Sequence, residues 1–557
     1  MRAGQFRLIA IYLVIMVLGC SGPNPTSTNG SQPDPSNPSS DPPPTNPSTP
    51  PPSPPANTPQ AVVTRNYDNM RSGVDSQETI LNPGAVTPAK FGKLFSYTLD
   101  SLVYTQPLYV PGLTIGGAQH NVVFVATEND TVYAFDADQK AGGPLWQKSL
   151  VNTGAGETSI PCAAVPGCSI APALGVTATP VISLSHNAIY IESRSVQNGT
   201  FMHKLHALDL TTGAEVLGGP TVISASVPGS ASDADAQGKV NFNPLREHSR
   251  PALLLSNGVI YLSFASVNDQ EPYHGWVLGY SADTLQPVSV FNVTPNGSEG
   301  GIWANNGASA DANGSIYVVA GNGTASPTNN NFGNSYLKLS PQLALADYFM
   351  PFNASALNAF DVDVGSGGLL LLPDQTDTPH THLIVAAGKE GRIYLIDRDN
   401  MGKFNAAGDT QIVQSIPNAV GTGQERNFYP PVFWNGRVYF SGANDVIRAF
   451  SLQGGQLSTA PVSQSSATFT FPGTGMIISS NGSTGGILWA LEWNVNTHVG
   501  TLHAYDPTNL TTEFWSSDQS GGRDALGAGM RLTVPLVANG KVYVGGSGTL
   551  TVYGLLQ

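Results

Sequence analysis

The chain has 557 residues, of which 40% are hydrophobic and 11% are charged, and it contains 61 glycines. This length exceeds what one ordinary core needs, so we expect several domains or one large repeat architecture. The formal net charge of -14 argues against a nucleic-acid partner, because the phosphates of nucleic acids attract Lys and Arg.

The first twenty residues have the pattern of a targeting segment. Arg2 and Arg7 precede or flank an apolar run, 8–18, that is too short to span a bilayer comfortably. The sequence LGC that ends at Cys20 resembles the lipobox of bacterial lipoproteins, whose cysteine is lipidated after cleavage. We therefore expect a lipoprotein signal peptide over 1–20 with a lipid on Cys20. An ordinary secretory signal or a short membrane anchor is the alternative.

Residues 21–60 consist mostly of Pro, Ser, Thr and Asn and carry almost no charge. Such a segment cannot bury enough apolar area to fold, so we predict a disordered, Pro-rich linker that holds the folded part away from a membrane. In lipoproteins, a Ser such as Ser21 after the lipidated cysteine favours the outer membrane. We therefore expect a location in the cell envelope, on the periplasmic side or at the surface of the outer membrane, with the lipid anchor as the contact with the membrane.

The two other cysteines are Cys162 and Cys168, which lie in one loop. An exported protein reaches a compartment that permits disulfides, so we predict a local disulfide between them. The sequence has no Cys-x-x-Cys-His motif, which would indicate an attached haem.

From Ala61 to the C-terminus, one pattern of two apolar runs joined by a turn occurs eight times. The copies begin at His120, His186, Asn257, Asn313, His382, Asn435, Gly485 and Asn539. A spacing of roughly 50 to 70 residues is typical of propeller blades. Asn-Gly dipeptides supply the positive φ angles of tight hairpins. We therefore predict an all-β fold over 61–557, a single eight-bladed β-propeller of four-stranded antiparallel blades.

The eighth copy ends at Gln557 and leaves no room for an outer strand. The run 91–100, FGKLFSYTLD, has strand character and belongs to no copy. We expect it to complete the last blade, so that N-terminal sequence closes the ring and removes the open sheet edges.

The segments VYAFDAD, LHALDLTTGAE and GKEGRIYLIDRDNMG resemble the repeats of the pyrroloquinoline quinone (PQQ) propeller superfamily, over about 66–557. Members of this superfamily include quinoprotein alcohol dehydrogenases and non-catalytic outer-membrane assembly lipoproteins. The repeat is specific for the fold and says little about activity. Asp136, Asp209 and Asp506 recur at one position of the repeat, so we interpret them as turn residues.

Residues that do not recur mark a candidate site. Loops at equivalent positions of neighbouring blades face one end of the central channel, so side chains from adjacent copies can meet there. Two carboxylates and an amide oxygen suit Ca²⁺, a Trp offers a flat face, and a Lys can pair with an anion. The unrepeated residues are Asp269, Glu271, His274, Trp276, Trp303, Asn322, Asp361, Asp363 and Lys389, with His248 and Arg250 as further basic groups. His274 also has a structural interpretation, as a buried and hydrogen-bonded His.

The resemblance implies roles for these residues. In quinoprotein dehydrogenases a Trp stacks on the quinone some eighteen residues before a Gly-Asn turn, and Trp303 and Asn322 match this Trp and the Asn that binds calcium. Asp269 matches the acidic calcium ligand, and Asp361 matches the catalytic base and a third calcium ligand. Lys389 matches a cofactor-binding Lys. The implied cofactors are PQQ and calcium, which polarises the quinone carbonyl in such enzymes.

Two functions stay open at this point. One is a lipid-anchored, PQQ- and calcium-dependent dehydrogenase that oxidises alcohols or sugars. The other is a non-catalytic propeller that binds a protein or a glycan as a scaffold at the cell envelope. The chain lacks the two adjacent cysteines that often lie against the quinone in the enzymes, which favours the second function. Each site residue also has a structural interpretation: Trp303 as a core aromatic, Asn322 as a turn residue and Lys389 as a solvated hairpin residue.

Overall fold

The structure is a computed structural model that describes residues 59–139, 143–376 and 378–557. The predicted signal peptide, Cys20 and the linker up to residue 58 lie outside the described residues. The described part is almost entirely β-structure. Its one α-helix is α1 (Ala354–Ala359), and single turns of 3₁₀ helix span Thr153–Ala155, Cys162–Ala164 and Pro327–Asn329.

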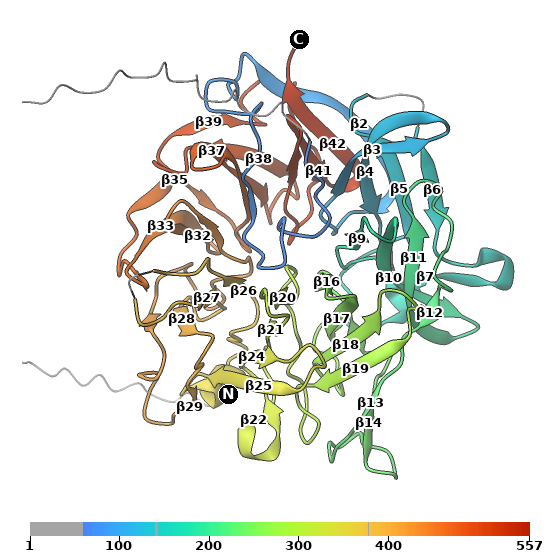
Figure 1. Cartoon of the computed structure of the whole chain (residues 1–557), viewed down its shortest axis with the longest axis vertical. Coiled ribbons are helices and arrows are strands. Elements are labelled where there is room, and N and C mark those ends of the chain that lie inside the picture. The colour runs from blue at the N-terminus through green and yellow to red at the C-terminus, as the bar shows by residue number, and fades with distance from the viewer. Residues whose placement is uncertain (1–58, 140–142, 377) are drawn as a thin grey trace, which may run out of the picture. The chain divides into compact units, whose positions relative to one another are not determined.

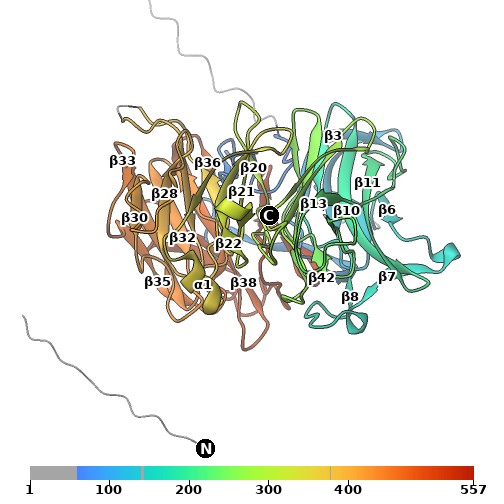
Figure 2. The ribbon, with the colours of Figure 1, turned by 90° about the horizontal axis from the view of Figure 1, so that it is seen from below.

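Eight antiparallel sheets follow one another around a ring and form the blades of a β-propeller (Figures 1 and 2). The predicted all-β, eight-bladed fold is thereby confirmed. The strands of each blade are given from the centre outwards. Blade one consists of β3 (Leu108–Ile115), β4 (Ala118–Ala126), β5 (Thr131–Asp136) and β6 (Trp146–Ser149), and blade two of β9 (Val181–Ser183), β10 (Ala188–Gln197), β11 (Thr200–Asp209) and β12 (Thr221–Val222). Blade three consists of β16 (Leu254–Ser256), β17 (Val259–Ser266), β18 (Trp276–Ser281) and β19 (Pro287–Asn292), and blade four of β20 (Ser309–Ala310), β21 (Ile316–Val319), β24 (Tyr336–Leu339) and β25 (Leu345–Met350).

The second half of the ring repeats this arrangement. Blade five consists of β26 (Leu369–Leu371), β27 (Leu383–Ala387), β28 (Ile393–Asp397) and β30 (Gln414–Ile416), and blade six of β31 (Val432–Trp434), β32 (Arg437–Ser441), β33 (Asp445–Gln453) and β35 (Ser463–Phe469). Blade seven consists of β36 (Thr474–Asn481), β37 (Thr484–Trp493), β38 (Gly500–Tyr505) and β39 (Glu513–Ser516), and blade eight of β40 (Leu536–Ala538), β41 (Lys541–Gly545), β42 (Ser547–Leu555) and β2 (Phe91–Leu102).

Short strands decorate these blades. They are β1 (Val74–Asp75), β7 (Glu157–Pro161), β8 (Ala173–Leu174), β15 (Glu247–His248), β29 (Lys403–Phe404) and β34 (Gln456–Leu457), and the hairpins β13 (Ser226–Pro228) with β14 (Lys239–Asn241) and β22 (Ala325–Ser326) with β23 (Asn331–Phe332). Of these, β7 pairs with β10 of blade two, and β15 pairs with β17 of blade three.

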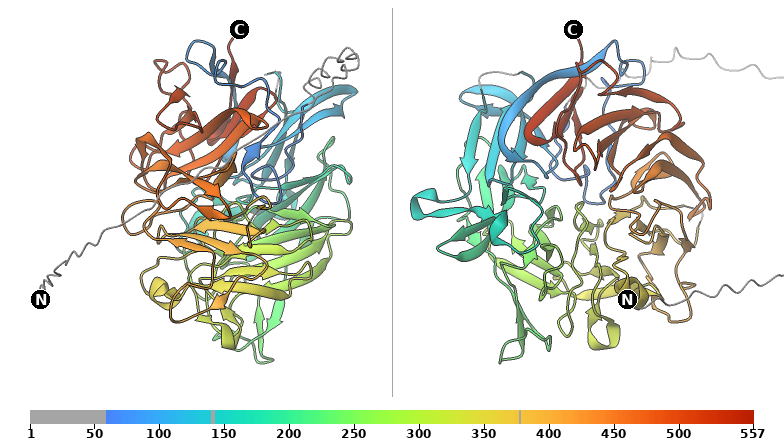
Figure 3. Two further views of the ribbon diagram at one scale, coloured as in Figure 1. Left: turned by 60° about the vertical axis from the view of Figure 1, so that its left-hand side comes forward. Right: turned by 180° about the vertical axis from the view of Figure 1, so that it is seen from behind.

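N-terminal sequence closes the ring, as predicted. Strand β2 pairs antiparallel with β42, so that Phe91 lies opposite Leu555 and Tyr97 opposite Leu550. Figure 3 shows the blue strand β2 beside the red strand β42. Because this pairing joins the two ends of the folded chain, neither β2 nor β42 is left as an open edge.

The turns between strands follow the Asn-Gly prediction. Asn257, Asn435 and Asn539 each have φ near +50° (50°, 49° and 49°), and each is followed by a glycine with positive φ. Asn tolerates this left-handed conformation better than most residues, and Gly adopts it without cost. These dipeptides therefore fix the hairpins that start the second strands of blades three, six and eight.

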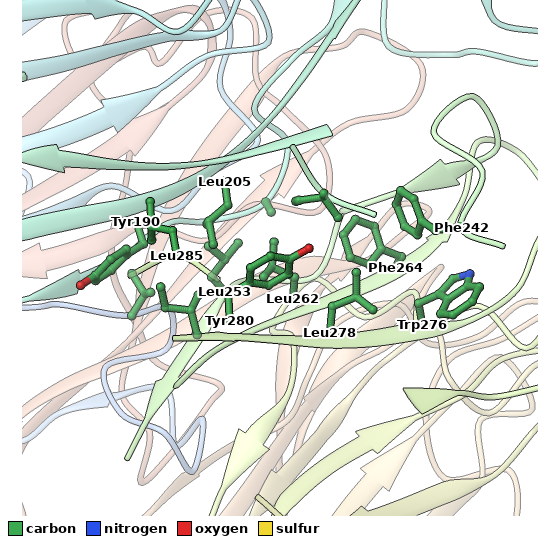
Figure 4. Packing of buried hydrophobic residues seen from close by; sticks show 14 of the residues in the cluster. Tyr190, Leu205, Phe242, Leu253, Leu262, Phe264, Trp276, Leu278, Tyr280 and Leu285 are labelled. Carbon is green, nitrogen blue, oxygen red and sulfur yellow. The ribbon is translucent and has the colours of Figure 1, made fainter. Parts of the chain in front are cut away.

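Neighbouring blades pack through their apolar faces. Between blades two and three, Tyr190, Leu205, Phe264 and Trp276 belong to one buried cluster (Figure 4). A single blade exposes both of its faces, so each blade depends on its neighbours for burial. Asp136 and Asp209, interpreted as turn residues, accept hydrogen bonds from backbone N–H groups two positions further on, as that interpretation requires.

The first described residues run through the middle of the ring, which the sequence did not indicate (Figure 1). We call residues 62–73 the central segment. It is hydrogen-bonded to the innermost strand of every blade. The residues whose peptide groups make these bonds are Tyr109, Ile182, Leu255, Ala310, Leu371, Phe433, Ile478 and Val537. The central segment therefore holds all eight blades at a common axis.

Arg71 is the most connected residue of the central segment. Its fully buried guanidinium donates from Nε to the Ala308 carbonyl (2.9 Å) and from Nη2 to the Leu253 carbonyl (3.1 Å). Its Nη1 donates to Thr64 Oγ1 (2.7 Å) and to the Arg65 carbonyl (2.9 Å). One side chain thus satisfies acceptors on the central segment and on blades three and four.

We predict that Arg71→Met destabilises the fold by about 3 kcal/mol, because buried acceptors lose their charged donor. Urea unfolding followed by intrinsic fluorescence measures the effect. Lys239→Met, on the exposed hairpin β13–β14, is the matched control and should change stability by no more than about 0.5 kcal/mol. Equal midpoints for the two variants would show that the central segment is not an anchor.

Candidate functional site

The loops at one end of the channel enclose a cavity of about 200 Å³. Five residues predicted from the sequence line it together: Asp269, Trp303, Asn322, Asp361 and Lys389. They come from loops after β17, β19, β21, β25 and β27, so strands of three neighbouring blades position them. Asp363, His248 and Arg250 also line the cavity. The structure therefore brings these residues into one place, whereas Glu271, His274 and Trp276 do not line the cavity.

Lys389 is the electrostatic centre of this group. Its ammonium lies 3.0 Å from Asp361 Oδ1, 3.0 Å from Asp363 Oδ1 and 3.4 Å from Glu425 Oε1. The Lys389 and Asp363 side chains are 13% and 4% exposed, whereas that of Asp361 is 62% exposed. Ion pairs weaken with exposure to water, so the pair with Asp363 is the stronger of the two.

Asp363 is the buried carboxylate of the cavity. Its Oδ1 accepts from Lys389, and its Oδ2 is buried without a hydrogen-bond partner in the described structure. Burial raises the pKa of Asp363 above its usual value, although the Lys389 ammonium opposes the shift. A carboxylate with one oxygen held and the other free suits proton transfer to or from a ligand.

The backbone of Gly321 explains how Trp303 and Asp363 come so close. A Cβ atom on Gly321 would lie 2.6 Å from Trp303 Cδ1 and 2.9 Å from Asp363 Oδ2. Glycine is therefore required at this position, where the strand β21 ends and the loop carrying Asn322 begins.

Trp303 presents its ring between a cation and a tyrosine. The guanidinium carbon of Arg250 lies 5.2 Å from the ring centroid, and Arg250 Nε donates to the Trp303 carbonyl (2.9 Å). The Tyr273 ring meets Trp303 edge-on, with centroids 6.2 Å apart. These contacts fix the orientation of the Trp303 indole at the cavity wall.

The residues predicted to bind calcium are each engaged with protein partners. Asn322 donates to Asp361 Oδ1 (2.7 Å), and its carbonyl oxygen accepts from Asn334 (3.0 Å). Asp269 Oδ1 accepts from the Tyr273 hydroxyl (2.8 Å). Within the described ranges, no three His, Cys, Asp or Glu side chains are grouped closely enough to hold a metal ion. The carboxylates are thus arranged around an ammonium, and they do not form a ready calcium site.

The loop that follows the disulfide also contributes to the cavity lining. Cys162 and Cys168 are bonded to each other, with Cα atoms 5.5 Å apart. The residues that follow, Ser169 and Ile170, line the cavity, and Ser169 Oγ accepts from Arg531 Nη2 (3.1 Å). The disulfide therefore ties down a loop that shapes the cavity and holds a third cation, Arg531, at its edge.

Sequence reasoning missed some residues of the cavity. Arg531 precedes the last blade, and Phe428 and Phe471, whose rings meet edge-to-face at 5.0 Å, come from loops around blade six. None of the three is near the unrepeated motifs in sequence. Their only signal is that loops before each innermost strand converge on the same end of the ring. His274, by contrast, is buried and bonded to Thr294 and Asp233, which agrees with a structural role.

The fold has clear relatives among solved structures. The quinohemoprotein alcohol dehydrogenase ADHIIG from Pseudomonas putida HK5 is 14% identical, with a TM-score of 0.59, over 89% of this chain and 80% of the other. The quinohemoprotein alcohol dehydrogenase from Comamonas testosteroni is 14% identical, with a TM-score of 0.58, over 89% of this chain and 80% of the other. A europium-containing methanol dehydrogenase is 15% identical, with a TM-score of 0.59, over 89% of this chain and 98% of the other.

These similarities establish the fold. The chain shares the eight-bladed propeller fold of these dehydrogenases, in agreement with the resemblance drawn from its repeats. At such low identity they do not establish an activity. No protein-family model matches the chain, and no curated protein matches its sequence.

We predict that Lys389→Met destabilises the protein by about 3 kcal/mol at pH 7, because it leaves a buried carboxylate unpaired. The stabilisation requires ionised Asp363, whose pKa lies above its usual value. It is therefore lost as the pH falls through that pKa. The difference between Lys389→Met and the wild type should shrink towards zero at acidic pH, as measured by urea unfolding at a series of pH values. Lys403→Met, at an exposed position, is the control. A difference independent of pH would contradict the ion-pair interpretation.

Proposed function

We propose that the cavity binds PQQ and that the protein is a quinone-dependent dehydrogenase of alcohols or sugars. One observation carries this proposal. A single cavity combines a fixed indole face, three cations and a buried carboxylate with a free oxygen. These residues are Trp303, Arg250, Lys389, Arg531 and Asp363.

The cavity chemistry fits PQQ, which is planar and carries three carboxylates. Arg250, Lys389 and Arg531 supply the matching positive charges, since guanidinium and ammonium groups pair well with carboxylates. Trp303 supplies an aromatic surface for a flat ring system. When bound, PQQ would supply the two-electron acceptor that no amino-acid side chain provides.

Asp363 is the residue that we assign as the base for the substrate hydroxyl. Asp363 lines the cavity, its Oδ2 has no hydrogen-bond partner among the described residues, and Lys389 holds Oδ1 in place. Its raised pKa brings it closer to neutral pH, where proton transfer by a side chain is most effective. Asp361, the base expected from the sequence, is largely exposed to solvent, so we prefer Asp363.

The calcium ion expected from the resemblance is a separate question. Because Lys389 already pairs with Asp361 and Asp363, and Asn322 with Asp361 and Asn334, the donors as arranged do not fit a divalent ion. No part of the proposed chemistry therefore depends on a metal. Quinone titrations in EDTA and in millimolar Ca²⁺ test the expectation, since a metal requirement would appear as binding only in the second buffer.

We predict that residues 59–557 bind PQQ with quenching of tryptophan fluorescence and retention of quinone absorbance after gel filtration. Trp303→Ala and Arg531→Gln should each weaken binding about tenfold or more, because each removes a central contact. Lys239→Met, at an exposed position outside the cavity lining, is the control. A wild-type protein that retains no quinone contradicts the proposal and favours the non-catalytic scaffold at the envelope.

We predict that Asp363→Asn leaves quinone binding intact and lowers dye-linked turnover of alcohols or aldose sugars by about 10²–10⁴-fold, the usual contribution of a general base. Asp361→Asn should lower it less. Steady-state rates with an artificial electron acceptor give the comparison. Equal losses, or a larger loss at Asp361, would return the role of base to Asp361.

We also propose that the protein is held at the cell envelope by a lipid on Cys20, with residues 21–60 as the spacer. Among the described residues, no helix is long and apolar enough to serve as a membrane span. Incorporation of labelled fatty acid into the wild type, and its loss in Cys20→Ser, would support the anchor. An unlabelled wild-type protein would favour an ordinary secretory signal.

A further inference from the structure

A buried arginine beside the cavity has no hydrogen-bond partner. Arg194, on β10 of blade two, is completely buried, and its Nε, Nη1 and Nη2 atoms all lack partners within the described structure. A guanidinium has five N–H donors and stays charged, so a dry and unpaired site for it would be very unfavourable. The Arg194 donors must therefore meet groups other than protein atoms.

Four carboxylates surround Arg194 and share this property. Glu192, Glu128, Asp130 and Glu247 are the charged groups that interact most strongly with it. All four are buried, and each has at least one oxygen without a partner among the described residues. Charges of opposite sign thus face one another without reaching hydrogen-bond distance. Such spacing is typical of groups bridged by ordered water.

Several buried hydroxyl groups in this region also lack hydrogen-bond partners among the described residues. Ser159 lies beside Asp130 and Thr177 beside Glu128, close enough to lower the pKa of each carboxyl group, but neither hydroxyl reaches the distance and angle of a direct hydrogen bond within the described structure. Ser195, which pairs with Ser159 in the β7–β10 register, is also buried and unpartnered. So many unpaired buried groups in one region indicate an internal volume that contains water.

One end of this region opens at the cavity. Glu247 lies on β15 next to His248 and pairs in register with Ser266 of β17. His248 and Ser266 both line the cavity, and His248 Nε2 and Ser266 Oγ are buried without partners. The polar region therefore reaches the cavity wall through these two residues.

The other end approaches the outside of blade two. Glu157, on β7, lies beside Ser195 and forms an ion pair with Lys204. The Lys204 side chain is 12% exposed, so this pair is close to solvent. Towards the apolar core the region is closed by Phe242, Phe264 and Trp276 (Figure 4), and Trp276 Nε1 donates to Glu247.

We propose that the side chains around Arg194 enclose a chain of water molecules that conducts protons between the cavity and the surface near Glu157. The presence of water around Arg194 does not depend on the proposed function. The role of this water in carrying the proton of the oxidation does rest on the proposed function. In the proposed oxidation Asp363 would take the hydroxyl proton of the alcohol, and a bound quinone would supply the acceptor for the hydride. The water chain then gives that proton a route out of the cavity past His248.

Isotope exchange at Glu247 tests the proposal without cofactor or substrate. Burial raises the pKa of Glu247 well above its usual value and that of Glu128 to about 7, so at mildly acidic pH we expect the C=O stretching band of a protonated carboxyl group in the infrared. Comparison of the wild type with Glu247→Gln identifies the band, and Glu128→Gln serves the same purpose if Glu247→Gln does not fold. We expect the band to shift within seconds of transfer to D₂O, although the group is buried.

Variants at the cavity wall locate the path. Ser266→Leu and His248→Phe should slow the exchange at least tenfold, because each fills the cavity end with apolar atoms. Val288→Leu, at an exposed position on β19 outside the cavity lining, should leave it unchanged. Exchange that takes hours in the wild type would overturn the proposal, as would a high-resolution crystal structure with no water at the Arg194 nitrogens. A protein that binds no quinone but exchanges rapidly would refute the proposed function alone.

Discussion

The hydrogen bonds between the central segment and all eight innermost strands are the constraint on which the rest of the structure depends. Blade repeats specify sheets that stack, but stacking alone does not fix how many blades close or where their inner edges stand. The hydrogen bonds that residues 62–73 make to these strands, together with those of the Arg71 side chain, place the eight inner strands around one axis. The β2–β42 pairing then closes the circumference. Arg65 links this segment to the cavity, because its guanidinium donates to the carbonyl of Leu532, which lines the floor.

A precise ring makes a precise cavity possible. The residues of the site come from loops on several blades, so their distances depend on the relative positions of those blades. Lys389 then orders the carboxylates electrostatically. It holds Asp363 in the dry part of the site and leaves Asp361 at the wet rim. The same loops would tolerate change in their exposed parts, whereas a substitution at Gly321 would push Trp303 and Asp363 apart.

The sequence predicts what is local or repeated. Asn-Gly turns, the eight strand pairs and the partnerless run 91–100 led to the correct propeller and to its closure. Subtraction of the repeat also identified Trp303, Asp361 and Lys389 as neighbours. The central segment could not be predicted, because its bonds reach residues up to several hundred positions away and use peptide groups that any sequence has. Arg531 and the Arg194 region were missed for a related reason, since burial and lack of partners are properties of the assembled ring.

The central segment also has a consequence for the order of events during synthesis. It leaves the ribosome before any blade, yet its partners extend to Val537 near the end of the chain. Contacts of such long sequence separation form late, because the entropy of closing a very large loop has to be overcome first. The full set of these bonds can therefore form only when translation is nearly complete, because Val537 belongs to the last blade. For the envelope location that we propose, this delay would be an advantage, since a ring that cannot lock before its last blade emerges stays loose enough to be threaded through a membrane.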